Sequence, residues 1–315
     1  MSHLKLYTKF LNKNLKISRP LKIVCDASNG TVGPVLKETF KNNKKIKLIL
    51  INQKSDGNFP AHGPNPLAKG AMDETSKRVI KEKADLGAVF DADADRVFFV
   101  DDKGNQLPSY LSSIVLFEAS KPPFIADELV YQSLRFLKIF SRKDLLPSKV
   151  GSYFVKVKMK EIKANVSAEY SGHFYFKDFF YADSGMLALI KMCNFISSSE
   201  DIWTSTLVHN VRAKTKYRSK VGYISKSGQL SEFIEKLPEF SIQTSEIKNA
   251  DVGEYEKKLQ KIAREKKAKI EKRDGITLIF ENGFLNLRPS NTEPIIRVTC
   301  GARTEEEGKE IINFI

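Results

Sequence analysis

Short, almost fully apolar runs alternate with loops and helical segments through the first hundred residues. Three of these runs are Leu21–Asp26, Ile46–Ile51 and Leu86–Phe90. Strands that are apolar at nearly every position are typical of parallel sheets, which helices cover on both faces. The segments between the runs have helical spacing around Leu36–Phe40 and from about residue 67 to residue 83. The alternation therefore predicts an α/β layer with a mainly parallel sheet.

The rest of the chain predicts two further units. From about residue 111 to residue 210 the pattern is repeated less clearly, with helices expected at Ile114–Phe117 and Met186–Phe195. Later, two alternating apolar runs are joined by Glu281-Asn-Gly283, which is a strong hairpin signal. We therefore expect an N-terminal helix and linker over residues 1–18, α/β domains over 19–112 and 113–213, and a C-terminal α+β domain over 214–315.

Composition and charge exclude several classes of protein. The 315 residues are 41% hydrophobic and 29% charged, which is typical of globular proteins and not of disordered or collagen-like chains. The formal net charge of +14 favours anionic partners, but the lysines are spread along the chain rather than gathered as in most nucleic-acid-binding proteins. No apolar stretch approaches the roughly 18 residues of a membrane span. Three distant cysteines indicate reduced thiols, so we expect a cytoplasmic protein without nucleic-acid or membrane partners.

The sharpest motif is Asp91-Ala-Asp-Ala-Asp95-Arg96, directly after the apolar run that ends at Phe90. Three carboxylates at alternate positions of a tight loop can direct their oxygens at one hard cation. Mg²⁺ fits this donor set, because it typically takes one or two protein carboxylates together with phosphate oxygens. The adjacent Arg96 could fork onto a phosphate held by that cation. The motif predicts a Mg²⁺ site at Asp91, Asp93 and Asp95.

This loop has two other functional interpretations. An EF-hand loop needs Gly at its sixth position and Glu at its twelfth, where this sequence has Arg96 and Asp102. A phosphatase of the haloacid-dehalogenase type also places Asp-x-Asp after a strand and uses one aspartate as nucleophile. A Mg²⁺-dependent phosphatase that uses Asp91 or Asp93 therefore remains an alternative.

A second motif runs from Arg288 to Arg297 as Arg-Pro-Ser-Asn-Thr-Glu-Pro-Ile-Ile-Arg. Two guanidinium groups flank short hydroxyl and amide side chains in a turn held by two prolines, which suits a phosphate. A third motif, Glu169-Tyr-Ser-Gly-His173, places a carboxylate, a hydroxyl and an imidazole within five residues. This set suits the recognition of sugar hydroxyls, although a capped loop with a core histidine explains it nearly as well. The Asp56–Pro66 segment, which contains His62, predicts only a rigid loop.

In this order, the motifs resemble the α-D-phosphohexomutase superfamily, in its phosphomannomutase/phosphoglucomutase branch. The resemblance extends from Asp26-Ala-Ser-Asn-Gly30 to the C-terminal region. It implies an α/β protein, with two related α/β phosphohexomutase domains plus a C-terminal α+β phosphate-binding domain. It also implies an intramolecular phosphotransferase that interconverts the 1- and 6-phosphates of a hexose, with Mg²⁺ as cofactor and glucose or mannose 1,6-bisphosphate as activator and intermediate.

The resemblance also assigns roles to individual residues. Asp91, Asp93 and Asp95 would bind Mg²⁺, and Arg96 would assist at the transferring phosphoryl group. Ring hydroxyls of the sugar would meet Glu169 and Ser171, beside His173. The non-reacting phosphate would be held by a set of donors in the last motif: Arg288, Ser290, Asn291, Thr292 and Arg297.

The sequence also departs from the family. Members carry the phosphoryl group on a serine of an N-terminal domain, and no such loop is found here; Ser28 lies in the opening loop of the second domain and is not expected to replace it. Ser152 follows Gly151 where relatives often have histidine. We therefore expect the isolated chain to bind hexose phosphate and Mg²⁺ without turnover, with a separate chain that carries the missing domain as a candidate partner. A non-catalytic phosphosugar-binding protein is the alternative.

Overall fold

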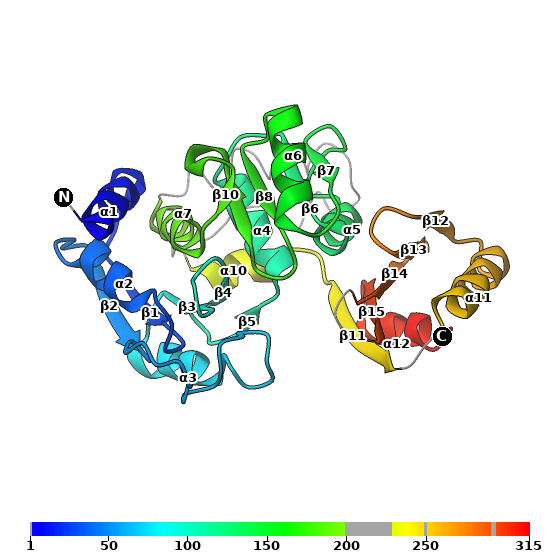
Figure 1. Ribbon diagram of the computed structural model, residues 1–315, viewed down its shortest axis with the longest axis horizontal. Helices are drawn as coiled ribbons and strands as arrows, with labels where there is room; N and C mark the ends of the chain where they lie inside the picture. The colour runs from blue at the N-terminus through cyan, green and yellow to red at the C-terminus, as the bar shows by residue number, and fades with distance from the viewer. Residues whose placement is uncertain (1, 199–228, 249–250, 291–293) are drawn as a thin grey trace.

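The computed structural model describes residues 2–198, 229–248, 251–290 and 294–315. Within these ranges the strands form three five-stranded sheets that follow one another along the chain (Figure 1). The first two sheets are mixed α/β units and the third is antiparallel with helices beside it. This arrangement confirms the expected fold class.

The first sheet has the strand order β2-β1-β3-β4-β5. Its strands are β1 (Leu21–Asp26), β2 (Ile46–Ile51), β3 (Leu86–Phe90), β4 (Val97–Val100) and β5 (Gln106–Leu107). The helices of this unit are α1 (His3–Asn14), α2 (Gly33–Phe40) and α3 (Asp73–Glu82). As expected, β1 pairs in parallel with β2 and β3, whereas β4 runs antiparallel because the six-residue turn before it is too short for a crossover.

Helix α3 is shorter than its sequence pattern predicts. The expected helical segment from about residue 67 to residue 83 contains a helix only over Asp73–Glu82. Gly70 has a φ of +81°, a backbone conformation that does not continue a helix, and it lies directly before the first turn. The residues before it belong to the loop that approaches Arg96.

The second sheet repeats the plan of the first, with the order β10-β9-β8-β6-β7. Its strands are β6 (Phe124–Ala126), β7 (Leu145–Pro147), β8 (Val166–Ala168), β9 (Phe174–Phe176) and β10 (Ala182–Asp183). The helices are α4 (Ser109–Glu118), α5 (Glu128–Leu137), α6 (Ser152–Ile162) and α7 (Gly185–Ser197), with a short 3-10 helix, η1, at Lys177–Phe179. The expected boundary between residues 112 and 113 falls inside α4.

The third sheet is antiparallel throughout, in the order β11-β15-β14-β13-β12. Its strands are β11 (Ser241–Lys248), β12 (Lys269–Glu271), β13 (Ile276–Ile279), β14 (Gly283–Pro289) and β15 (Ile295–Ala302). Helices α10 (Leu230–Glu235), α11 (Val252–Glu265) and α12 (Glu305–Ile312) belong to this part of the chain. The hairpin predicted at Asn282-Gly283 is confirmed by the pairing of β13 with β14.

The first two units share one hydrophobic core, whereas the third has its own. Phe99 of β4 and Phe174 of β9 are both fully buried in the same cluster, with ring centroids 6.5 Å apart. Leu278, Leu285 and Val298 lie in a separate cluster of the third sheet. The first two units are therefore fixed against each other by apolar packing.

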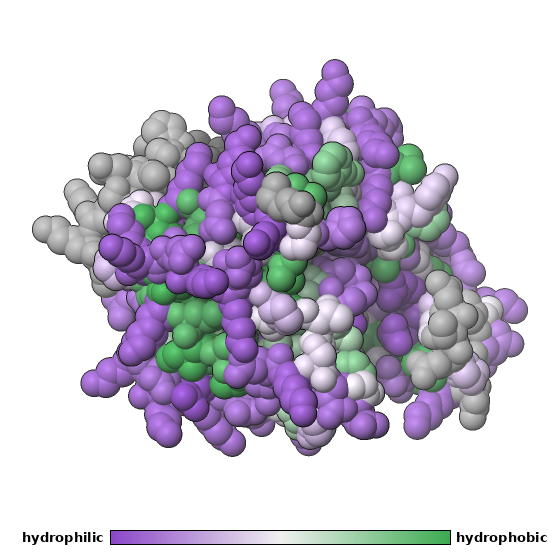
Figure 2. Space-filling model, turned by 60° about the vertical axis from the view of Figure 1, so that its left-hand side comes forward, coloured by the Kyte–Doolittle hydropathy of each residue, from purple (hydrophilic) through white to green (hydrophobic). Residues whose placement is uncertain are grey.

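Other expectations from composition concern the cysteines and the surface. Cys25, Cys193 and Cys300 are buried and unpaired, as predicted. None of the helices in the described ranges is both long enough and apolar enough to cross a membrane. Hydrophilic side chains cover most of the face shown in Figure 2, where a hydrophobic area interrupts them on one side.

Candidate functional site

The turn between β3 and β4 brings the three predicted aspartates together. Carboxylate oxygens of Asp91, Asp93 and Asp95 all lie within 4.8 Å of one another. Asp91 is 2% exposed, Asp95 is partly exposed and Asp93 is exposed, so the cluster opens from the sheet edge toward solvent. Three hard oxygen donors in this arrangement fit Mg²⁺.

Arg96 is held against the buried end of this cluster. Its Nε donates to Oδ2 of Asp91 at 2.6 Å, and its backbone N–H donates to Oδ1 of the same residue at 3.2 Å. Its Nη1 donates to Oδ1 of Asn65 at 3.4 Å. Asp91 and Asn65 thus fix the orientation of the guanidinium beside the predicted metal ligands.

The electrostatics of the cluster suit a bound cation. Burial raises the pKa of Asp91 to about 6, although the hydrogen bond and charge of Arg96 oppose this shift. The hydrogen bond to His173 lowers the pKa of Asp95. A divalent cation would favour the ionised form of both carboxylates, because an opposite charge at short range stabilises the charged state.

The aspartate turn is supported on two sides by backbone contacts that leave no room for larger side chains. Thr31 donates its N–H to the carbonyl of Ala92 at 2.9 Å, and Gly185 donates to the carbonyl of Ala94 at 3.1 Å. A Cβ at Gly30 would lie 2.3 Å from the Ala92 oxygen. The turn is therefore fixed by the first loop of its own unit and by the start of α7.

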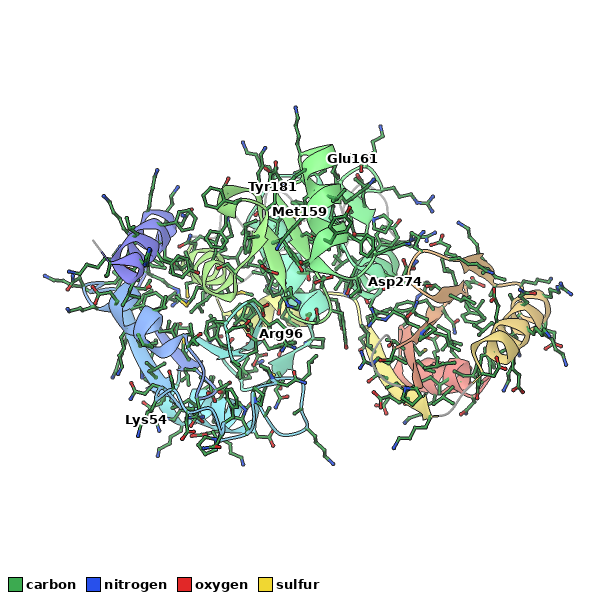
Figure 3. The ribbon with its side chains drawn as sticks, viewed as in Figure 1. Lys54, Arg96, Met159, Glu161, Tyr181 and Asp274 are labelled. Atoms are coloured by element: carbon green, nitrogen blue, oxygen red, sulfur yellow. The ribbon has the colours of Figure 1, made fainter. Side chains whose placement is uncertain are left out.

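The predicted sugar-binding loop lies directly against the aspartate turn. Arg96 and His173 form an isolated antiparallel bridge, and Val97 donates its N–H to the carbonyl of Gly172 at 3.2 Å. Nε2 of His173 lies 3.5 Å from Oδ2 of Asp95. Figure 3 shows Arg96 at the junction of the first two units. The structure therefore joins two motifs that are about 75 residues apart in the sequence.

Within this second loop, Glu169 is buried, and each of its carboxylate oxygens accepts one hydrogen bond. Its Oε1 accepts from the N–H of Gly151 at 2.7 Å, and its Oε2 accepts from the hydroxyl of Tyr175 at 2.8 Å. Ser171 and His173 are more accessible, with Ser171 Oγ 2.8 Å from His173 Nδ1. Burial lowers the pKa of His173, but its hydrogen bond to Asp95 and the surrounding carboxylates outweigh burial, so its pKa lies above the ordinary value.

The third predicted motif lies in the C-terminal sheet. Arg288 of β14 and Arg297 of β15 are direct cross-strand partners, and Ser290 donates its N–H to the carbonyl of Ile295 at 2.9 Å. Nη1 of Arg288 is 3.3 Å from Oδ2 of Asp274, which Figure 3 places on the side of this unit that faces the second unit. Asn291 and Thr292 lie outside the described residues. The arginine pair therefore belongs to a different sheet from the other two motifs.

Sequence reasoning did not assign Asn65 and Asp183 to the site. Asn65 belongs to the Asp56–Pro66 segment, for which the sequence predicts only a rigid loop, yet it orients Arg96. In the same loop, Nε2 of His62 lies 3.2 Å from Oδ2 of Asp26. Ligand atoms of Asp183, His173 and Asp95 lie within 4.8 Å of one another, which makes a second group able to hold a cation. The available signal was position, because Asp183 ends β10, the second strand after the predicted sugar-binding motif. Ser152 begins α6 immediately after Gly151.

Known proteins place these features in one family. Three profiles, all described as phosphoglucomutase/phosphomannomutase, match the alpha/beta/alpha domain II at residues 4–104, the alpha/beta/alpha domain III at 133–214 and the C-terminal domain at 247–315. A phosphomannomutase of Methanocaldococcus jannaschii is 34% identical over 98% of this chain and 63% of its own length. A phosphomannomutase of Escherichia coli is 32% identical over 92% of this chain and 60% of its own length.

A solved structure shows the same fold. The phosphoglucomutase/phosphomannomutase family protein of Burkholderia thailandensis superposes with a TM-score of 0.75 and 24% identity, covering 98% of this chain and 62% of that one. The chain spans only about three fifths of the length of these relatives. Because the three profiles follow in order and together match most of its residues, the chain belongs to the phosphoglucomutase/phosphomannomutase family.

Proposed function

We propose that this chain provides the metal-binding, sugar-binding and phosphate-binding parts of a phosphohexomutase that acts on hexose 1- and 6-phosphates. The observation that carries the proposal is the contact between the aspartate turn and the Glu169–His173 loop, through the Arg96–His173 bridge and the Asp95–His173 pair. In this proposal the cation site and the sugar-binding donors share one edge between two sheets. The relatives named phosphomannomutase support this proposal.

Mg²⁺ would be held by Asp91, Asp93 and Asp95 and would neutralise charge on a phosphoryl group. Arg96 stands beside the same carboxylates with its guanidinium oriented by Asp91 and Asn65. Phosphoryl transfer requires mainly positioned positive charge from a protein. In this proposal Arg96 supplies that charge next to the metal.

The sugar and its second phosphate would be held by the other two motifs. Glu169, fixed by Gly151 and Tyr175, keeps lone pairs for a hydroxyl donor, while Ser171 and His173 are accessible beside it. The phosphate that does not react would be bound by the C-terminal loop, through Arg288, Ser290, Asn291, Thr292 and Arg297. Glucose or mannose 1,6-bisphosphate is the doubly phosphorylated ligand that such a pair of phosphate sites would accept.

The hydrogen bonds of Asp91 favour this proposal over a phosphatase that uses Asp91 as its nucleophile. Both of its oxygens accept from Arg96, one from the side chain and one from the backbone. A nucleophilic carboxylate needs a free oxygen directed at phosphorus. Asp91 is better suited to bind a cation and to orient Arg96 than to attack a phosphate ester.

Calorimetric titration tests the proposal with four ligands: glucose 6-phosphate, mannose 6-phosphate, glucose and inorganic phosphate. The proposal predicts that at least one hexose 6-phosphate binds more tightly than glucose or phosphate, and that chelation of Mg²⁺ changes this affinity. Equal binding of phosphate and both sugar phosphates would contradict sugar recognition. No binding of any of the four, with Mg²⁺ present, would contradict the proposal as a whole.

A further inference from the structure

A large cavity lies between the second and third units, away from the aspartate turn. Its volume is about 980 Å³, and it is lined by the end of α5, by the segment that leads to β7, by the β13–β14 hairpin and by Arg303 after β15. Cavities of about 300–1,000 Å³ are the usual size for small organic ligands. None of its lining residues belongs to the three motifs of the proposed function.

Basic side chains outnumber acidic ones in the lining of this cavity. Five of its lining side chains are basic and one, Glu281, is acidic; the basic ones are Arg135, Lys138, Arg142, Lys143 and Arg303. Arg135 is paired with Glu271 at 3.4 Å. In the part of the chain that the structure describes, the other four form no ion pair. Their uncompensated charge gives the cavity a positive potential that attracts anions.

The remaining wall is aromatic and aliphatic. Four aromatic side chains line it, each only partly buried: Tyr131, Phe136, Phe140 and Phe280. Phe140 packs on Phe124 of its own unit at 5.5 Å between ring centroids, whereas Phe136 packs on Phe284 of the third unit, so both rings are held in place by packing. Fixed aromatic faces bind planar ring systems by stacking.

We propose that this cavity is a second anion site, which binds a nucleoside diphosphate. The aromatic wall would take the base, and the unpaired guanidinium and ammonium groups would take the two phosphates, since arginine forks onto phosphate oxygens. The nucleoside alone would contact only the aromatic wall, and the diphosphate alone would contact only the basic side chains. The assignment does not depend on the proposed mutase function, because it uses none of the same residues.

Such a ligand would bridge two units of the molecule. Arg142 and Lys143 come from the second unit, whereas Phe280 and Arg303 come from the third. The cavity also adjoins the ion-pair network through Arg135, which contacts Glu271 of β12. A bound nucleotide therefore adds contacts between the second and third units, and the complex should resist thermal unfolding better than the free chain.

The experiment is a titration of the full chain with ADP, adenosine and pyrophosphate, without added metal. We expect ADP to bind with a Kd below about 1 mM and more tightly than either fragment. Charge reversal in the double variant Arg142→Glu, Lys143→Glu should weaken the affinity for ADP about tenfold or more. The matched control, Lys9→Glu with Lys13→Glu on exposed positions of α1, should leave the affinity unchanged.

Four results would overturn the assignment. Undetectable ADP binding by the wild-type chain, or unchanged affinity in the Arg142/Lys143 variant, would remove the site. Equal affinity for pyrophosphate and ADP would remove the role of the aromatic wall. Displacement of ADP by excess glucose 6-phosphate would place the nucleotide in the hexose phosphate site, whereas continued ADP binding supports a separate cavity even if no sugar phosphate binds.

Discussion

At the scale of single residues, Asp93 offers the simplest test of the cation site. Asp93 is exposed and lies with Asp91 and Asp95 within 4.8 Å, so its replacement should leave the buried sheet edge intact. We predict that Asp93→Asn weakens the binding of Mn²⁺, a spectroscopic substitute for Mg²⁺, by about tenfold to a hundredfold. Paramagnetic resonance of free Mn²⁺ measures this directly. The exposed control Asp178→Asn should bind as the wild type does; an unchanged Kd in Asp93→Asn would contradict the ligand set.

Glu118, near the end of α4, predicts a dependence of stability on pH. Burial raises its pKa to about 7 from an ordinary 4.5, and its Oε1 has no hydrogen-bond partner among the described residues. The folded chain keeps this proton at pH values where the unfolded chain has lost it. The free energy of unfolding of the wild type should therefore fall as pH rises from about 4.5 to about 7. It should stay at the lower value at pH values above about 7.

The corresponding variant is Glu118→Gln, which removes the buried charge. We expect it to raise the free energy of unfolding by about 1–3 kcal/mol at pH 8 and to have little effect near pH 4.5. Urea unfolding at the two pH values measures the difference. The exposed control Glu239→Gln should show a change that does not vary with pH. A Glu118→Gln effect of the same size at both pH values would disprove the explanation.

At the scale of elements, the site arises because two sheets share one plan. The aspartate turn joins β3 to β4, and the Glu169–His173 loop joins β8 to β9, which are the corresponding strands of the second sheet. The two turns meet edge to edge at the Arg96–His173 bridge. The proposed metal site and the proposed sugar site thereby lie side by side without long loops.

The glycine that supports the aspartate turn provides an element-scale prediction. A Cβ at Gly30 would lie 2.3 Å from the Ala92 oxygen, so Gly30→Ala must displace the turn. We expect a loss of about 1–3 kcal/mol in stability and weaker Mn²⁺ binding. At Gly57 a Cβ meets nothing within 4 Å, which makes Gly57→Ala the matched control. Unaltered Mn²⁺ binding in a folded Gly30→Ala protein would show that the turn does not need this support.

Much of the fold could be predicted from the sequence because its elements are locally encoded. The runs that become β1, β2 and β3 are mostly apolar, and Asn282-Gly283 marks the hairpin between β13 and β14. The sequence pattern starts α3 too early, because the helical spacing of residues 67–72 does not reveal the positive φ of Gly70. The contacts of Arg96 with Asn65 and His173 join distant segments, so sequence spacing could not reveal them.

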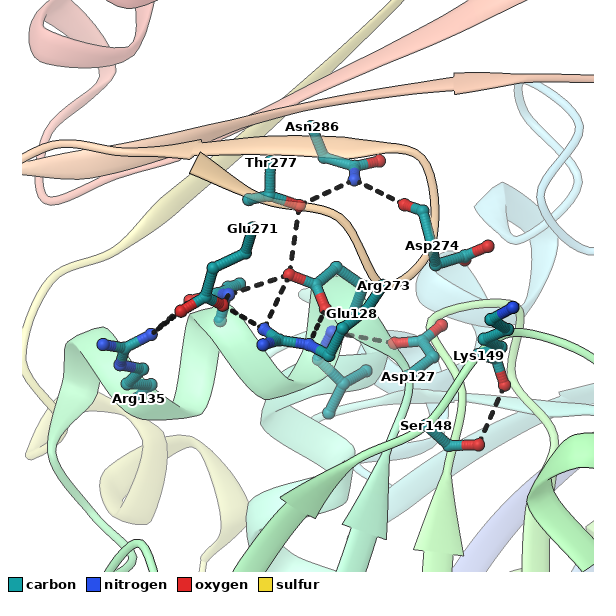
Figure 4. Close-up of polar contacts among 12 residues, drawn as sticks. Asp127, Glu128, Arg135, Ser148, Lys149, Glu271, Arg273, Asp274, Thr277 and Asn286 are labelled. Carbon is teal, nitrogen blue, oxygen red and sulfur yellow. Dashed lines mark hydrogen bonds and ion pairs between the residues drawn. The ribbon is translucent and has the colours of Figure 1, made fainter. Parts of the chain in front are cut away.

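At the scale of the whole molecule, a polar network joins the second and third units (Figure 4). The carboxylate of Glu128, 1% exposed, accepts from Nε of Arg273 at 2.9 Å and from Oγ1 of Thr277 at 3.0 Å. Arg273 and Arg135 also pair with Glu271. The third unit has its own core, so these ion pairs contribute to fixing its position.

Removal of Arg273 should therefore loosen the third unit. Arg273→Ala leaves the carboxylate of Glu128 buried without its cationic partner. Breaking a buried ion pair in this way lowers the free energy of unfolding by about 3 kcal/mol. We expect a lower melting temperature and a larger radius of gyration in small-angle X-ray scattering. Arg264→Ala, at an exposed position of α11, is the control. An unchanged radius of gyration in Arg273→Ala would mean that other contacts hold the third unit.

The central claim is that loops from two units and from the third sheet bind one hexose phosphate. The most direct test is calorimetric titration of glucose 6-phosphate, with Mg²⁺ present, into the wild type, Ser171→Ala, Arg288→Gln and the double variant. The account predicts one site per chain, about tenfold or greater loss of affinity in each single variant, and a double-variant loss that differs from the sum of the two free-energy changes. Unchanged affinity in either single variant would contradict the claim.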